Sequence, residues 1–293
     1  MQIIQNGPAR RTLAGSMLRG YREAKGFDLG VAADILGCDR SKISRIETGE
    51  RGIRAEDLRK LLGEYGVASA TIDTLTTICH PHNDHDWWQH YRKVLPASHL
   101  DFIITEGAAS RILVYAPTRI PELLATPGYA RAVADADPAV PEGLTEIRVQ
   151  AVIARHQAIM FDHQPDVTVI LGEAALRQQV GGPDVMRQQF AHLAAVGRAH
   201  AWLTIHLLPF SAGAHAASDS GAFSLLRFDD MPDVGVAHLA GPAGGVYVDD
   251  TPVIAACADA FARLSRHTIT PAQSLLRFRQ LARARLRSAR QEG

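Results

Sequence analysis

The first 66 residues place apolar side chains at helical spacing in short segments that end at glycines. The segment 12–25, TLAGSMLRGYREAK, carries its apolar residues three or four positions apart and is followed by Gly26. This pattern predicts an amphipathic helix that ends at a glycine. A second helix is expected from Asp28, as an N-cap residue, to Leu36, with Gly37 at its end.

A third helix is predicted over 40–48, RSKISRIET, with Asp39 as its N-cap and Gly49 just past its end. A fourth helix, EDLRKLLGEYG (56–66), follows the loop GERGIR. Two short helices that are joined by a tight, glycine-containing turn inside a small helical bundle are typical of the helix-turn-helix motif.

The third predicted helix divides into two faces. Ile43 and Ile46 are three positions apart, which predicts that they anchor the helix to the bundle. The other side carries the polar residues Arg40, Ser41, Lys42, Ser44 and Arg45. A recognition helix needs this division, because arginine can hydrogen-bond guanine in the major groove and serine is short enough to let the helix sit deep. The alternative is an amphipathic helix whose charges are simply solvated.

Arg51 and Arg54 flank the start of the fourth predicted helix. Cationic side chains beside the free backbone N–H groups of a helix start form a phosphate-binding site. We therefore expect both arginines to contact the DNA backbone.

The segment 37–67, GCDRSKISRIETGERGIRAEDLRKLLGEYGV, resembles the Xre-type (phage-repressor-like) helix-turn-helix domain. The shared signature is Ser-x-Ile-Ser-Arg-Ile-Glu-x-Gly. The resemblance implies that Arg40, Ser41, Ser44 and Arg45 face the bases and that Lys42 lies at the groove edge. The sequence departs from the family at Leu29, which is usually a glutamine that braces the recognition helix, and at Ala32, which is usually a leucine.

The remainder of the chain mixes two periodicities. Helical segments are predicted over 87–95, 100–111, 144–160, 182–199, 252–265 and 272–287. Strands are predicted over 167–171, 204–209, 221–228, 234–240 and 244–248. Because the last four strands follow one another with short turns, we expect an α+β fold in which an antiparallel sheet is flanked by helices. The predicted organisation is a helix-turn-helix domain (1–78), a linker (79–86) and an α+β domain (87–293).

The segment CHPHNDHDWWQHY (79–91) has the residue types of a metal site. Cys79, His82 and His85 are each three positions apart, and His90 follows. Structural zinc sites, however, usually pair two close ligands with a second pair a dozen or more residues away, which is missing here. We interpret the segment as a polar connector and expect no metal and no cofactor. A further hypothesis is that His82, His85 and His90 make this joint pH-sensitive.

Composition and charge limit the classes of function that the protein can have. Apolar residues make up 46% and charged residues 21% of the 293 residues, which is typical of a soluble globular protein. Residues 1–66 hold twelve Lys and Arg against nine Asp and Glu, whereas the rest holds 19 against 22. A basic front on an acidic body permits contact with nucleic acid. Three distant cysteines and the lack of a long apolar run predict a cytoplasmic protein without membrane contact.

Several polar patterns in the body invite a catalytic interpretation. Ser211, His215 and Asp219 are close in sequence, but catalytic triads assemble from distant segments. Glu122, Glu146, Arg155 and His156 lie in separate segments, and the sequence does not pair them. We therefore expect no enzyme, and the sequence offers no catalytic residues.

The segments WWQHYRKVLP, EGAASRILVYAPTRIPELLATPGYARAV, RVQAVIARHQAI, LGEAALRQQVGGPDVMRQQFAHL and LLPFSAGAHAASDSGAFSLLRF resemble the domain that follows an Xre helix-turn-helix in a large family of actinomycete regulators. That domain has no established activity. The resemblance implies a transcriptional regulator. Some relatives are antitoxin-like and are encoded beside a small partner protein.

We expect a sequence-specific DNA-binding regulator whose α+β domain senses a small-molecule effector or holds a partner protein. One helix-turn-helix buries little surface, so a homodimer on palindromic double-stranded DNA is expected. Aromatic residues that could line an effector pocket are Trp87, Trp88, Tyr115, Phe161 and Trp202. One alternative is an antitoxin-like interaction module that never touches DNA. Another is an enzyme with a DNA-targeting front, which requires a convergent polar pocket in the body.

Overall fold

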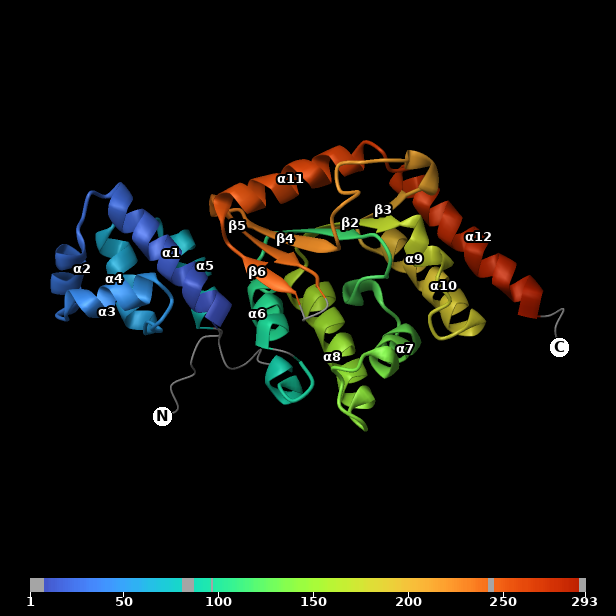
Figure 1. The fold of residues 1–293 in the computed structure, drawn as a ribbon, viewed down its shortest axis with the longest axis horizontal. Helices are drawn as coiled ribbons and strands as arrows, with labels where there is room; N and C mark the ends of the chain where they lie inside the picture. Colours follow the sequence, from blue (N-terminus) through green and yellow to red (C-terminus); the bar gives the residue numbers. More distant parts are fainter. Residues whose placement is uncertain (1–7, 81–86, 96, 242–244, 290–293) are drawn as a thin grey trace.

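The computed structural model of the chain describes residues 8–80, 87–95, 97–241 and 245–289. The N-terminal part is a bundle of helices, seen in blue in Figure 1. Its helices are α1 (Pro8–Ala24), α2 (Leu29–Leu36), α3 (Arg40–Glu47), α4 (Ala55–Glu64) and α5 (Ser69–Cys79). The first four confirm the helices that the apolar spacing predicts, with ends that differ by a few residues.

The core of the bundle comes from the apolar positions of these helices. Leu13 and Leu18 of α1, Ile43 of α3 and Leu58 and Leu62 of α4 are almost completely buried. Burying a side chain of this size contributes about 1.5–3 kcal/mol, so the interior outweighs the weak helix propensity of such short segments.

A six-stranded sheet forms the centre of the second part, in the order β3-β2-β1-β4-β5-β6. The strands are β1 (Arg111–Ala116), β2 (Asp166–Gly172), β3 (Leu203–Leu208), β4 (Phe223–Phe228), β5 (Met231–Leu239) and β6 (Val246–Val248). The α+β class is confirmed. The sheet is mixed, however, because β1 pairs with β2 and β2 with β3 in parallel, whereas the pairs β1–β4, β4–β5 and β5–β6 are antiparallel.

The central strand β1 is absent from the sequence prediction, which extended a helix over 100–111. That helix, α6 (Ala97–Glu106), ends before Gly107, and the strand begins at Arg111. The strand sequence RILVYA is nearly all buried, as expected of a strand covered on both faces. A short apolar run of this kind does not alternate, so its periodicity does not identify it as a strand.

Helices cover both faces of the sheet (Figure 1). They are α7 (Pro127–Ala136), α8 (Thr145–Gln157), α9 (Glu173–Arg177), α10 (Pro183–Ala199), α11 (Thr251–Ser265) and α12 (Pro271–Ala289). On one face, Phe261 and Leu264 of α11 pack with Tyr115 and Ile170 of the sheet. The helix predicted over 87–95 is a short 3-10 helix, Trp87–Tyr91, and α7 was not predicted at all.

The bundle and the α+β domain touch at α1 and α6 and at further points along α1 and α5. The Arg10 Nε–H donates to Asp101 Oδ1 at 3.1 Å, and both side chains are buried. Nearby, the Ser16 hydroxyl donates to Asp249 Oδ2 at 3.0 Å. The Thr71 hydroxyl donates to the Asp230 backbone oxygen at 2.9 Å. These contacts join segments that lie far apart in the sequence.

The histidine-rich segment lies largely outside the described residues, which include Cys79 and His80 but not 81–86. Cys79 ends α5 and is completely buried, and this burial raises the pKa of its thiol to about 12. Within the described parts of the chain, His, Cys, Asp and Glu form no group of three that could hold a metal. No described helix is long and apolar enough to span a membrane.

Candidate nucleic-acid interface

The turn between α2 and α3 has the predicted length and chemistry. The Asp28 carboxylate accepts the Val31 N–H at 2.9 Å and caps α2. Gly37 ends α2 with φ +61°, in the left-handed region that glycine adopts without strain. Asp39 holds the N-cap position of α3, but its side chain makes no capping hydrogen bond, which corrects that part of the prediction.

The two faces of α3 are confirmed by burial. Ile43 and Ile46 are 1% and 2% exposed and fix the helix to the bundle. Arg40, Ser41 and Arg45 are exposed, whereas Lys42 and Ser44 are half-buried. The polar face is thus open to a macromolecular partner while its apolar anchors are held inside.

The three basic side chains of α3 have different surroundings. The Arg40 guanidinium lies so close to Gly30 of α2 that a Cβ there would be 2.4 Å from its Nη2. Lys42 Nζ lies 3.7 Å from Asp57 Oδ2 at the start of α4. Arg45 Nε lies 3.6 Å from Glu50 Oε2, and both side chains are more than half exposed. Exposed ion pairs of this kind are weak, so Arg45 can exchange its partner at little cost.

Arg51 and Arg54 lie at the start of α4, as predicted. Both are exposed, and Arg54 is the N-cap residue of the helix. A guanidinium has no acceptor, so the Arg54 side chain cannot cap the first N–H groups of α4. The acidic residues Glu56 and Asp57 in the same turn moderate the positive potential there.

A buried ion pair supports the recognition helix. Arg22 of α1 donates to Glu47 of α3 through Nε at 2.7 Å and Nη2 at 2.8 Å. Its Nη1 donates to the Phe27 backbone oxygen at 2.7 Å. The hydrogen bond to Glu47 is the main reason that the pKa of Arg22 is raised. Glu47 belongs to the signature quoted above, but its partner lies 25 positions away, and the sequence pattern does not connect the two.

Gly15 of α1 allows close packing against the end of α3. A Cβ at this position would lie 2.4 Å from the Ile46 backbone oxygen and 2.6 Å from that of Glu47. The backbone of α3 therefore rests directly on α1.

Burial also changes the charge argument for the bundle. Arg10 and Arg22 are 2% and 7% exposed and are paired with Asp101 and Glu47. These two arginines are not available to DNA. The positive charge that remains accessible is concentrated on and after α3.

The α+β domain brings together polar groups that the sequence left apart. Glu122 Oε2 lies 3.3 Å from Arg155 Nη1, and the His156 Nε2–H donates to the Glu122 backbone oxygen at 2.5 Å. Glu146 is elsewhere, paired with Arg131 at the surface. Glu122 and Arg155 also line one pocket of the described residues, so the polar convergence that the enzyme alternative requires is present there.

The sequence-adjacent trio does not form a catalytic arrangement. Ser211 and Asp219 are exposed. The His215 ring accepts the Ala217 N–H through Nδ1 at 3.3 Å, within its own turn.

Comparisons with known families account for both parts of the chain. Residues 14–75 match the model described as Helix-turn-helix domain. Residues 100–280 match the model described as Domain of unknown function (DUF5753). Curated proteins and solved structures gave no match. Because the second match spans more than half of the chain and follows a helix-turn-helix domain, the protein belongs to the DUF5753 family.

Proposed function

We propose that the protein is a sequence-specific transcriptional regulator of the Xre type, similar to those of actinomycetes. The observation that carries the proposal is the exposed Arg and Ser face of α3, held by two buried isoleucines, inside a helix-turn-helix domain. In this proposal the recognition helix, 40–48, enters the major groove. Arg51 and Arg54 contact phosphates. The protein acts in the cytoplasm, where its DNA is.

The proposed complex is a homodimer on a palindromic operator. A single helix-turn-helix buries too little surface for useful affinity, and two copies read half-sites about one helical turn apart. Selection of bound fragments from the host genome would give the operator and its symmetry. A selected sequence without two-fold symmetry would contradict the dimer.

Arg45→Ala is expected to weaken operator binding by about 1–3 kcal/mol and to relax base preference at one position of each half-site. Arg40→Ala is expected to have the same effect at another base position. In the unsubstituted protein, the Arg40 guanidinium reaches that base by moving away from Gly30. Titration of operator and base-substituted fragments would measure both effects. The matched control is Arg59→Ala, which removes an exposed arginine that pairs with Asp73 on α5. If neither variant of α3 differs from this control, the recognition-helix assignment is wrong.

Arg51→Ala is expected to weaken binding to all DNA sequences alike. A lost phosphate contact releases about one fewer counterion, so the slope of log K against log salt should flatten by about 1. Titrations at several salt concentrations would measure the slope, with Arg19→Ala on α1 as the control. An unchanged slope would remove Arg51 from the phosphate contacts.

We further propose that the α+β domain senses a ligand or holds a partner and is not an enzyme. The support is electrostatic. Burial alone would raise the pKa of Glu122, but His99, Arg148 and Arg155 lower it well below its ordinary value, which makes the carboxylate a weak general base. The alternative is an antitoxin-like module that acts mainly on a small partner protein. Shifted mobility of operator DNA at physiological salt would decide against that alternative.

A further inference from the structure

A cavity of about 590 Å³ lies at the end of the central strand β1. Its walls come from the last residues of β1, the first residues of β4, and helices α6, α7 and α8. Pockets for small molecules usually have volumes of about 300–1,000 Å³ and lie outside the carboxyl ends of strands in α/β sheets. Of the aromatic residues that the sequence suggested, Tyr115 lines this cavity, whereas the lining does not include Trp87, Trp88 or Trp202, and the Phe161 side chain lies outside the described residues.

Part of the lining is apolar and carries two aromatic side chains from helices, Phe102 of α6 and Tyr129 of α7, which form the aromatic wall. Both are almost completely buried, so their positions are set by the core. Tyr115 and Phe223 also border the cavity, but they pack with Phe261 and Leu264 of α11. A flat apolar body fits such a wall better than a flexible polar one.

Beside it lies a charged wall, in which Glu122 is shared by His99, Arg148 and Arg155. Glu122 accepts from Arg148 Nη2 at 2.5 Å and lies 3.2 Å from His99 Nε2. Arg155 also reaches Glu122, but it is already held by two hydrogen bonds of 2.7 Å to Glu106, a residue behind the cavity wall. Arg148 and His99 are therefore served by one carboxylate between them. Their side chains are 13% and 17% exposed, so both are within reach of a ligand.

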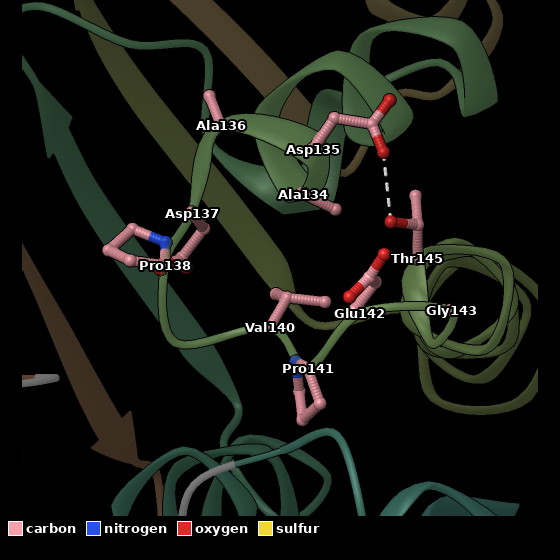
Figure 2. Close-up of a pocket in the computed structure, with 10 residues that line it drawn as sticks. All are labelled: Ala134, Asp135, Ala136, Asp137, Pro138, Val140, Pro141, Glu142, Gly143 and Thr145. Carbon is pink, nitrogen blue, oxygen red and sulfur yellow. Dashed lines mark hydrogen bonds between the residues drawn. The ribbon is translucent and has the colours of Figure 1, made fainter.

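The remaining charged residues make the two ends of the cavity electrostatically different. Arg119 adds a third guanidinium to the lining, and Asp137 adds a carboxylate whose Oδ1 accepts the Ala139 N–H. Asp137 also lines a second hollow of about 570 Å³, in the connection between α7 and α8 (Figure 2). There Asp135 accepts the Thr145 hydroxyl at 2.8 Å, and Glu142 lies nearby. An anion is favoured at the arginine end and disfavoured at this acidic end.

We propose that the cavity binds a small amphipathic carboxylate, with its carboxylate at Arg148 and His99 and its apolar body against the aromatic wall. A ligand carboxylate would supply a second acceptor to donors that now share Glu122, and planar guanidinium groups pair with carboxylates at two points. The proposal rests on the proposed function, because it names the ligand class of the sensing domain.

Helix α6 connects this cavity to the DNA-binding bundle. Phe102 forms part of the cavity wall, and the neighbouring Asp101 holds Arg10 of α1. The Arg155 guanidinium lies 5.4 Å from the Phe102 ring centroid, so the charged wall also touches α6. A ligand that shifts α6 would bias the position of α1, and reciprocity then requires that operator DNA changes the affinity for the ligand.

Three probes of one shape and different charge test the proposal: 2-naphthoate, 2-naphthalenemethanol and 2-naphthylmethylammonium. Calorimetric titration of the full chain should give an affinity for the naphthoate about 10- to 100-fold above that for the alcohol, with the ammonium weakest. Arg148→Gln should remove this preference. Ala222→Trp, which places a large side chain in the cavity lining, should weaken all three probes. Arg131→Gln, which removes a surface arginine paired with Glu146, is the control and should change nothing.

Equal affinity for acid and alcohol, or no binding of any probe, would overturn the proposal. So would naphthoate binding that survives both Arg148→Gln and Ala222→Trp. If Arg148→Gln does not fold, Arg119→Gln tests the same wall at an exposed position. Operator titration without a probe is run in parallel. Lack of operator binding contradicts the proposed function alone, whereas lack of charge preference among the probes contradicts the cavity assignment alone.

Discussion

Glu47→Ala is expected to destabilise the N-terminal bundle by about 3–5 kcal/mol and to abolish operator binding, although Glu47 itself faces the interior. The substitution removes the two-point partner of the Arg22 guanidinium, which is 7% exposed and keeps only the Phe27 backbone oxygen and, at 3.4 Å, the exposed Glu23 carboxylate. A buried charge without its partner is costly, and the loss falls on the contact that sets α3 against α1. Urea unfolding followed by circular dichroism, together with operator titration, would measure both effects.

Two further variants separate the buried pair from a general effect of removing an acid. Glu50→Ala removes the exposed partner of Arg45 and should change stability by less than about 0.5 kcal/mol. The double variant Arg22→Leu/Glu47→Leu removes both buried charges and should recover much of the lost stability, because apolar groups of similar size need no partner. If Glu47→Ala is no less stable than Glu50→Ala, the ion pair does not support α3.

The recognition helix could be predicted in detail because the residues that determine it are close together in the sequence. The period of 3.6 residues places Ile43 and Ile46 on one face, and the structure buries both. The glycine ends and the Asp28 cap are local in the same way. Asp39 shows the limit: an N-cap residue type at an N-cap position still makes its hydrogen bond only if the side chain turns inward.

The sheet and the cavity could not be predicted with the same detail, because the residues that determine them are far apart in the sequence. Whether β2 pairs in parallel with β1 depends on the crossover through α7 and α8, and the sequence analysis placed no helix at α7. The ion pairs at the charged wall join Glu106 of α6, Glu122, and two residues of α8, Arg148 and Arg155. Sequence analysis singled out two of these four residues but had no means of pairing them.

Asp101→Ala is expected to cost about 3–5 kcal/mol and to uncouple the two domains. The substitution leaves the Arg10 guanidinium buried at 2% exposure, with its Nη1 donating to the Ile78 backbone oxygen at 3.3 Å. The cost of this unpaired charge is expected to weaken the contact between α1 and α6. The tryptophans Trp87, Trp88 and Trp202 all lie after the bundle, so their fluorescence reports the α+β domain, whereas operator binding reports the bundle. In the variant, tryptophan fluorescence and operator binding should be lost at different urea concentrations, because the two domains no longer unfold in one two-state transition.

The double variant Arg10→Leu/Asp101→Leu distinguishes the roles of charge and packing at this contact. It removes the buried pair without leaving an unpartnered charge, so the two probes should again coincide and most of the stability should return. Asp249→Ala, which breaks the half-exposed hydrogen bond to Ser16, is the control and should leave the transitions coincident. If the transitions of Asp101→Ala stay coincident, the domains are joined mainly by their apolar contacts, and α6 is not the element that carries a signal from the cavity to α1.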